Sequence, residues 1–142
     1  MISVGRSRVE VLFGGGSPAP TSFADLSLDR RGAGAVPALR LDAPPRRIEC
    51  YDISNFQGDH FVGSMVVCED GQMNKSEYRR FKIRYHENKP DDVAMIREVL
   101  TRRLKEGKLG NPKFNRMPDL IIVDGGRGQL SSAVAAMEAT GT

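Results

Sequence analysis

The most constraining feature of this 142-residue sequence is a short apolar run near its end, Leu120-Ile121-Ile122-Val123, which Asp124 follows at once. The run has no alternation of apolar and polar side chains, so we expect both faces of the strand it forms to be covered. Strands of this kind lie inside sheets that carry helices. The run therefore predicts an α/β fold in which this strand lies in the middle of the sheet.

The segments on either side of this run predict the other elements of the sheet. Three earlier segments alternate apolar and polar residues or are rich in β-branched residues, and Asp70-Gly71 is a typical hairpin turn. Pro90-Asp91-Asp92 opens a helix with Val93, Ile96, Leu100 and Leu104 on one face, which Gly107 ends. We expect strands at residues 48–54, 62–68, 78–85 and 119–124, and a last helix at 129–139. Because three meandering strands precede a crossover, the sheet is mixed, with 119–124 parallel to 48–54.

The first third of the chain differs in composition from the rest. Residues 1–47 hold six Gly and five Pro, and no strand or helix period persists there. We therefore predict a low-complexity linker or mostly disordered segment at residues 1–44 and one domain at residues 45–142. The alternative is part of a domain cut from its neighbours. Residues 9–13 resemble a strand, but no nearby segment is a convincing partner for it.

Two acidic residues stand where their charge needs an explanation. Asp52 lies within a predicted strand among apolar neighbours, and Asp124 ends the buried strand. If those strands are neighbours, their backbones lie about 4.8 Å apart, and two carboxylates at that spacing repel each other unless a proton or cation lies between them. Hard oxygen ligands suit Mg²⁺ or Mn²⁺. The pair thus suggests metal-dependent hydrolysis of a phosphodiester.

Each of these acidic residues also has a structural explanation. Asp124 alone is well explained as a helix cap or turn former. Asp52 could be neutralised by an ion pair with Arg46, Arg47 or Lys82. The glycine-rich run at residues 125–128 fits either a phosphate-binding nest or a tight turn, and it is not a P-loop.

The middle of the chain is basic. Residues 75–116 contain 13 Lys and Arg against 6 Asp and Glu, so Arg79, Arg80 and Lys82 are candidates for nucleic-acid contacts. The alternative is an ordinary solvated surface. Asn55, with Ser54 and Gln57, is placed to shape the rim of the site.

Several other classes of protein are disfavoured by the sequence. Cys50 and Cys68 are expected to be reduced core thiols. His60 and His86 have no partners at metal-ligand spacing, so neither predicts a zinc site. No apolar run approaches 18 residues and no leader is recognisable, which predicts a protein without a membrane segment, located in the cytoplasm.

Five segments, in order, resemble one known family, the C-terminal endonuclease domain of UvrC, the excision nuclease of bacterial nucleotide excision repair. They are RRIECYDISNFQG, VGSMVVCEDG, KSEYRRFKI, PDDVAMIREVLTRRL and PDLIIVDGGRGQL. The resemblance covers about residues 45–141 and does not extend to residues 1–43.

The resemblance implies an RNase H-like fold, truncated at the C-terminus, and a function. The expected function is incision on the 5′ side of a lesion in double-stranded DNA, within the SOS response, together with the partner proteins UvrA and UvrB. It also implies that Asp52 and Asp124 are the catalytic residues and that they hold Mg²⁺ or Mn²⁺.

One member of the family's catalytic set has no match in this sequence. The third catalytic residue is a His on a later helix, and the sequence ends at Thr142, before that helix. We do not transfer this role to His60 or His86. We therefore expect the chain by itself to cleave weakly or not at all, and the alternative is a non-catalytic fragment that binds DNA or protein.

Overall fold

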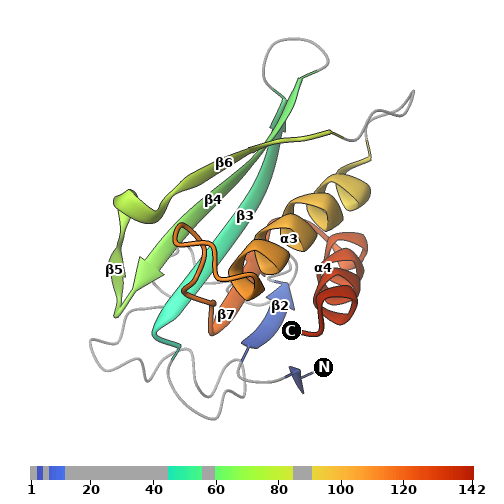
Figure 1. Ribbon diagram of the computed structural model, residues 1–142. Coiled ribbons are helices and arrows are strands. Elements are labelled where there is room, and N and C mark those ends of the chain that lie inside the picture. The colour runs from blue at the N-terminus through green and yellow to red at the C-terminus, as the bar shows by residue number, and fades with distance from the viewer. Residues whose placement is uncertain (1–2, 5–6, 12–44, 56–59, 85–90) are drawn as a thin grey trace, which may run out of the picture.

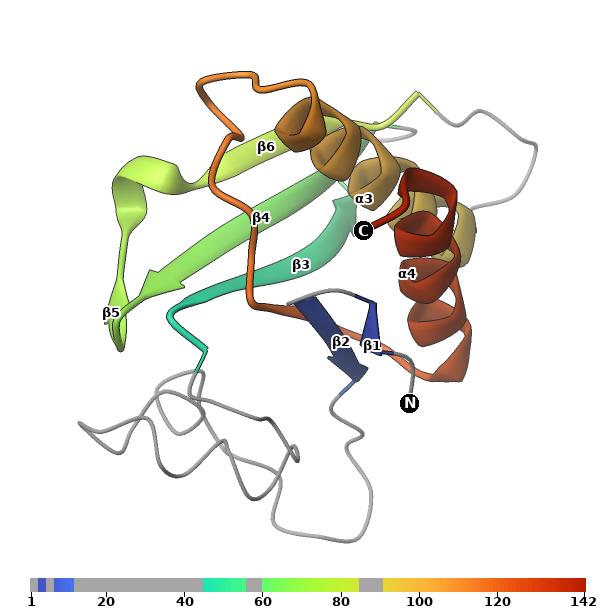
Figure 2. The same cartoon turned by 60° about the horizontal axis from the view of Figure 1, so that its bottom comes forward.

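The computed structural model describes residues 3–4, 7–11, 45–55, 60–84 and 91–142. Within these residues, seven strands form one mixed sheet. Two α-helices, α3 (Asp92–Lys108) and α4 (Arg127–Thr140), lie side by side over one face of that sheet (Figures 1 and 2). The predicted α/β class with a mixed sheet is confirmed.

The central strand of the described sheet is β3 (Arg47–Asn55). It pairs antiparallel with β4 (Phe61–Glu69) and parallel with β7 (Leu120–Val123). The predicted parallel pairing of the crossover strand with the first strand is thus confirmed. All four residues of β7 are buried, as the absence of alternation in its sequence predicted.

The outer strands on the β4 side complete the predicted meander. Asp70 and Gly71 have φ angles of 48° and 80°, the conformation that a tight hairpin turn requires. The chain then forms β5 (Gln72–Met73) and the short 3₁₀ helix η1 (Lys75–Glu77). It returns along β4 as the edge strand β6 (Arg79–Lys82), which is shorter than the predicted 78–85.

Two short strands near the N-terminus correct one expectation. The strands β1 (Ser3–Val4) and β2 (Ser7–Val11) pair with each other, and β2 also runs parallel to β7. The expectation that this strand-like run lacks a partner is therefore wrong, because β2 extends the sheet beyond β7. Residues 12–44 lie outside the described residues, and the boundary at residue 44 stays a prediction.

The main core lies between the sheet and the two helices. The predicted apolar face of α3 is confirmed for Ile96, Leu100 and Leu104, which are buried, whereas Val93 at the start of the helix is 37% exposed. Asp91 caps α3, since its Oδ1 accepts hydrogen bonds from the N–H groups of residues 93 and 94. The sheet contributes the alternate residues Tyr51, Met65, Val67, Phe81, Ile83, Ile121 and Val123.

One charged cluster lies inside this core. The guanidinium of Arg103 on α3 donates to both oxygens of Glu49 on β3, at 2.8 and 3.1 Å, and both side chains are 0% exposed. The hydroxyl of Tyr51 donates to the same carboxylate at 2.6 Å. Arg103 also donates to the carbonyl oxygens of Phe114 and Arg116. Arg103 therefore ties the loop between α3 and β7 to the central strand.

Candidate functional site

Asp52 lies on β3, and Asp124 comes directly after the adjacent strand β7, on the same face of the sheet. The paired residues of β3 and β7 end with Tyr51 opposite Val123, and the N–H of Asp124 donates to the carbonyl oxygen of Tyr51 at 3.2 Å. One residue further along, Asp52 and Asp124 therefore lie opposite each other. Their side chains point away from α3 and α4, because Tyr51 and Val123 point toward the helices. Both carboxylates are exposed.

Asp52 and the nearby thiol of Cys50 both have a raised pKa. Partial burial, and then the negative charge of Asp124, raises the pKa of Asp52 above its ordinary value, with a smaller contribution from Asp92 at the start of α3. Burial, and then Asp124 and Asp52, raises the pKa of Cys50 to about 11. Two like charges held this close favour a cation between them.

The helix-cap explanation of Asp124 and the ion-pair explanation of Asp52 do not fit the observed contacts, whereas Asp124 does begin the turn that leads into α4. The helix α4 begins at Arg127 with Gly126 as its N-cap, so Asp124 is not the cap. Arg46 pairs with Asp70, and Arg47 pairs with Glu49 and Glu69. The structure gives Asp52 no ion pair among the described residues. No ion pair or cap among the described residues therefore explains the carboxylate of Asp52.

The glycine-rich run after Asp124 forms a tight turn into α4. Gly125 has a φ of 140°, and a Cβ there would lie 2.5 Å from the Cδ atom of Gln129. The side chain of Gln129 in turn accepts a hydrogen bond from the N–H of Gly126 at 2.9 Å. One N–H of the suggested phosphate nest is therefore already occupied, which favours the tight turn.

The structure brings no third metal-ligand side chain to this pair within the residues it describes, where no group of three His, Cys, Asp or Glu could hold an ion. His60 is exposed and immediately precedes β4, and His86 and Gln57 lie outside the described residues. Neither Cys50 nor Cys68 forms a disulfide bond; Cys68 is buried, as predicted, and Cys50 is partly buried. The described part of the chain also contains no helix with the length and apolar character needed to cross a membrane.

The predicted nucleic-acid contacts fall on two different faces. Arg80 and Lys82 are exposed and alternate with buried Phe81, so they share the face of Asp52. The side chain of Arg79 lies on the helix side, where its guanidinium donates to two backbone carbonyl oxygens, both at 2.9 Å. Asn55 is exposed at the end of β3, with its side chain on the opposite face from that of Asp52 by alternation.

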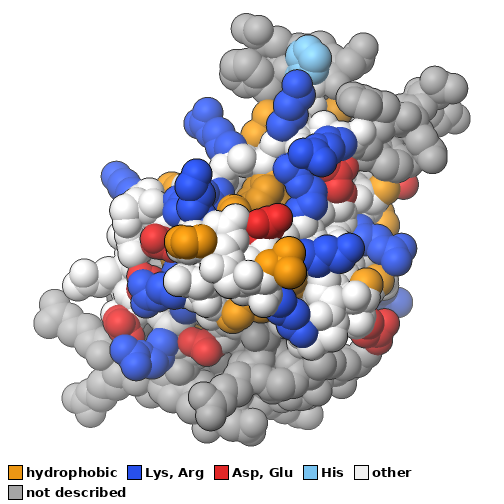
Figure 3. Space-filling model, viewed as in Figure 1, with side chains coloured by type: hydrophobic (Ala, Val, Ile, Leu, Met, Phe, Trp, Pro, Cys, Tyr) orange, Lys and Arg blue, Asp and Glu red, His pale blue; other side chains and the backbone are white. Residues whose placement is uncertain are grey.

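The helix-covered face has a mixed charge. Figure 3 shows Lys and Arg side chains spread over α3 and β6 on this face, with acidic side chains among them. Several of these cations are paired, such as Arg102 with Glu98 at 3.1 Å. Much of the basic excess of residues 75–116 is therefore an ordinary solvated or ion-paired surface on this side.

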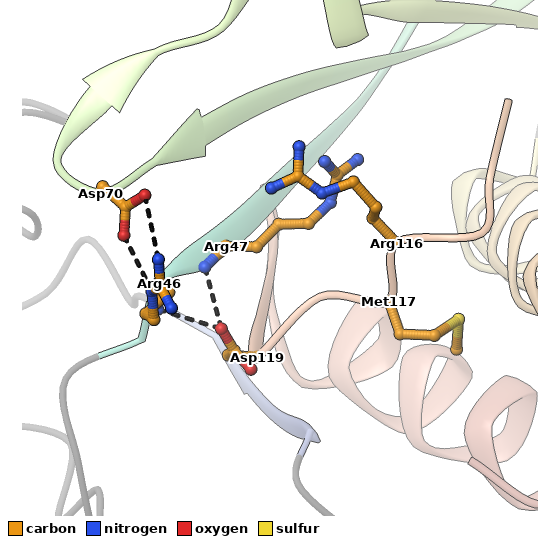
Figure 4. Close-up of a pocket in the computed structure, with 6 residues that line it drawn as sticks. All are labelled: Arg46, Arg47, Asp70, Arg116, Met117 and Asp119. Atoms are coloured by element: carbon orange, nitrogen blue, oxygen red, sulfur yellow. Dashed lines mark hydrogen bonds and ion pairs between the residues drawn. The ribbon is translucent and has the colours of Figure 1, made fainter.

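A small polar cavity of about 240 Å³ lies at the opposite end of β3 from Asp52 (Figure 4). Its charged groups pair with one another. Asp119 accepts hydrogen bonds from the backbone N–H groups of Arg46 and Arg47, at 3.0 and 2.9 Å, and the side chain of Arg46 pairs with Asp70. Arg116, which also lines the cavity, pairs with Glu69. The cavity joins the starts of β3 and β7 and does not resemble a ligand site.

The fold and the position of the two carboxylates define a class of protein. A mixed sheet with a central strand antiparallel to one neighbour and parallel to the other, covered by two helices on one face, is the RNase H-like arrangement. The sequence model of the UvrC RNAse H endonuclease domain matches residues 37–142. The chain therefore belongs to this family.

Curated relatives support the same assignment. The chain is 47% identical to UvrABC system protein C of Desulforudis audaxviator, over 72% of this chain and 19% of the relative. It is 49% identical to the protein of that name from Anaeromyxobacter dehalogenans strain 2CP-1, over 77% of this chain and 15% of the relative. The protein from Acidobacterium capsulatum is 51% identical over 73% of this chain and 16% of the relative. The chain thus spans less than a fifth of the length of these relatives.

Proposed function

We propose that this chain is the endonuclease domain of a nucleotide excision repair protein and that Asp52 and Asp124 are its catalytic residues. The main support is the placement of two exposed carboxylates opposite each other, Asp52 within β3 and Asp124 directly after β7. The substrate is double-stranded DNA that carries a lesion, and the incision is on its 5′ side. UvrA and UvrB are the partners, and the cytoplasm is the compartment.

Mg²⁺ or Mn²⁺ fits the donor atoms of this pair. Two carboxylates supply hard oxygen ligands, and Mg²⁺ in phosphoryl-transfer sites is commonly bound through only one or two carboxylates. Asp52 and Asp124 would hold the ion, which would activate water and stabilise the charge that develops on the phosphate. Both carboxylates are carried by the backbone of the sheet, Asp52 within β3 and Asp124 directly after β7, and this rigid support would keep the ligand atoms in place.

The contacts with DNA are proposed for side chains around this pair. Arg80 and Lys82 contribute exposed positive charge on the face of Asp52, whereas Asn55 lies at the end of the same strand as Asp52 with its side chain on the opposite face. Arg79 is a weaker candidate than the sequence alone suggested, because its guanidinium already binds backbone carbonyls. Phosphate contacts of this kind give affinity that falls as salt rises.

A plasmid-nicking assay with Mn²⁺ or Mg²⁺ tests the proposal. We expect weak or no nicking by the 142-residue chain. Any nicking that is measured should fall at least about 100-fold in Asp52→Asn and in Asp124→Asn, since each removes a ligand of the ion. Asp70→Asn is a matched control, because Asp70 is an exposed carboxylate outside the site. Nicking that persists in both site variants would contradict the assignment.

The second candidate function is DNA or protein binding without cleavage. The observation that favours it is the pair of carboxylates without a third ligand among the described residues. Salt-sensitive binding of DNA, with no nicking under any divalent ion, would support this function. Robust turnover by this chain would instead show that a third catalytic side chain is dispensable.

A further inference from the structure

The register of three strands places one hydroxyl and one guanidinium in line with Asp52. Asp52 on β3 lies opposite Ser64 on β4, and Ser64 lies opposite Arg80 on β6. Side chains of directly paired residues project from the same face of a sheet. Asp52, Ser64 and Arg80 therefore form one row across the face that is turned away from α3 and α4. Two residues further along, Lys82 lies on this face of the same edge strand.

The side chains of this row are available for a ligand. Asp52, Arg80 and Lys82 are exposed, and Ser64 is half-buried. Ser64 lies between Gly63 and Met65, which are both buried, and its side chain projects from the opposite face of β4 to that of Met65. A hydroxyl in such a strand does nothing for the core. Its position between a carboxylate and a guanidinium points to a role in binding.

The charges in the row change sign from one end to the other. The carboxylate end is suited to a cation, and the guanidinium end is suited to a phosphate. Neighbouring strands lie about 4.8 Å apart, so the backbones at Asp52 and Arg80 are separated by about 10 Å. One strand of B-DNA advances about 3.4 Å along the helix axis per phosphate. Arg80 can therefore reach a phosphate within about three nucleotides of one that lies at Asp52.

We infer that Ser64, Arg80 and Lys82 form a phosphate track, along which the DNA strand to be cut crosses β4 from Asp52 to the edge strand β6. The inference rests on the proposed function for the identity of the ligand, and it adds a direction for the DNA strand and one new contact, Ser64. Ser64 donates its hydroxyl hydrogen to a phosphate oxygen next to the scissile one. Arg80 and Lys82 bind the phosphates that follow toward the edge of the sheet.

Arg79 offers a matched control for this inference. It is adjacent to Arg80 in the same strand and carries the same charge, but its side chain lies on the helix side and binds backbone carbonyls. A simple basic surface would lose similar affinity on removal of either charge. The phosphate track predicts that only the loss of Arg80 matters.

The test measures the binding of a fluorescein-labelled duplex oligonucleotide to the 142-residue chain by fluorescence anisotropy. The buffer contains Ca²⁺, and the titration is repeated at several KCl concentrations. We expect Arg80→Gln to raise Kd about 5–10-fold and to lower the slope of log Kd against log salt by about 1. Ser64→Ala should raise Kd about 2–5-fold without changing the slope, because a neutral hydroxyl displaces no counterion. Arg79→Gln should leave Kd within about twofold, and thermal melting verifies that each variant is folded.

Equal effects of Arg79→Gln and Arg80→Gln would overturn the inference, as would the absence of DNA binding by the unmodified chain. Because the assay measures binding and not cleavage, its outcome is separate from that of the nicking assay. Loss of binding confined to Arg80→Gln and Ser64→Ala would support the phosphate track even if the chain cut no DNA. Nicking abolished in the Asp52 and Asp124 variants, with no special effect of Arg80, would support the catalytic pair and refute the track.

Discussion

Replacing Arg103 with Met should destabilise the domain more than any exposed charge substitution. Arg103 and Glu49 are both 0% exposed and share two hydrogen bonds, so removing the guanidinium leaves a buried carboxylate with reduced compensation. Removing one partner of a buried ion pair costs about 3–5 kcal/mol. A domain of this size has a total stability of about 5–15 kcal/mol. Arg103→Met therefore removes a large part of the free energy of unfolding.

The loop between α3 and β7 contributes to this cost. Arg103 also donates to the carbonyl oxygens of Phe114 and Arg116, at 3.0 and 2.6 Å. Gly107 lets the loop approach the helix closely, since a Cβ there would lie 2.8 Å from the carbonyl oxygen of Phe114. Loss of the guanidinium thus loosens the loop as well as the strand, and protease cleavage within residues 109–118 should become faster.

Urea unfolding followed by far-ultraviolet circular dichroism measures the effect. The control is Arg102→Met, one residue earlier on α3, which removes a partly exposed pair with Glu98 at 3.1 Å and a cation–π contact with Phe81. That control should lose about 0.5–1.5 kcal/mol. A loss below about 1 kcal/mol in Arg103→Met, or equal losses in the two variants, would refute the claim that the Arg103–Glu49 pair is a buried support of the fold.

Three other substitutions have defined outcomes. Because burial and then Asp124 raise the pKa of Asp52, its ionised form costs stability at pH 7. Without divalent ions Asp52→Asn should therefore melt up to about 3 °C higher than the unmodified chain, and the difference should vanish as pH falls toward the unfolded pKa of about 3.9. Mg²⁺ should raise the melting temperature of the unmodified chain only, and equal shifts in both would contradict the metal site. Gly125→Ala should cost about 1–3 kcal/mol in urea unfolding, because its φ of 140° and its contact with Gln129 exclude a Cβ. Gly63→Ala should cost about 1–3 kcal/mol, because a Cβ there would lie 2.6 Å from a methyl group of Val99; unchanged unfolding curves would refute either claim.

Local patterns in the sequence were sufficient for most elements of the domain. Alternation predicted β3 and the faces of β6, and the unbroken apolar run predicted the buried strand β7 with Asp124 at its end. The pairing of β2 with β7 left no local signal, because it joins backbones more than 100 residues apart. The ion pair of Glu49 with Arg103 was missed for the same reason, since two charged residues 54 positions apart each resemble ordinary surface residues.

The sequence also contained signals for Arg80 and Ser64, but they could be interpreted only once the pairing register of the strands was known. Alternation within β6 already separates Arg79 from Arg80, but nothing local says which face carries the carboxylates. Ser64 is likewise a polar residue within an apolar strand, between Gly63 and Met65, and this position was the available signal for it in the sequence. Its meaning depends on its pairing with Asp52, which the strand register fixes.

The alternation of β3 separates the residues that support the fold from those proposed for chemistry. Glu49 and Tyr51 point toward the helices and join the buried cluster, whereas Asp52 points to the other face and is exposed. The fold therefore tolerates two carboxylates close together at Asp52 and Asp124. Both are exposed to solvent, and neither belongs to the buried cluster that stabilises the domain. Substitutions of Glu49 should lower the free energy of unfolding, and cleavage should be lost only because the domain unfolds. Substitutions of Asp52 should abolish metal binding without lowering the free energy of unfolding. A variant of Asp52 that unfolded the chain would show that the two functions of this strand are not separate.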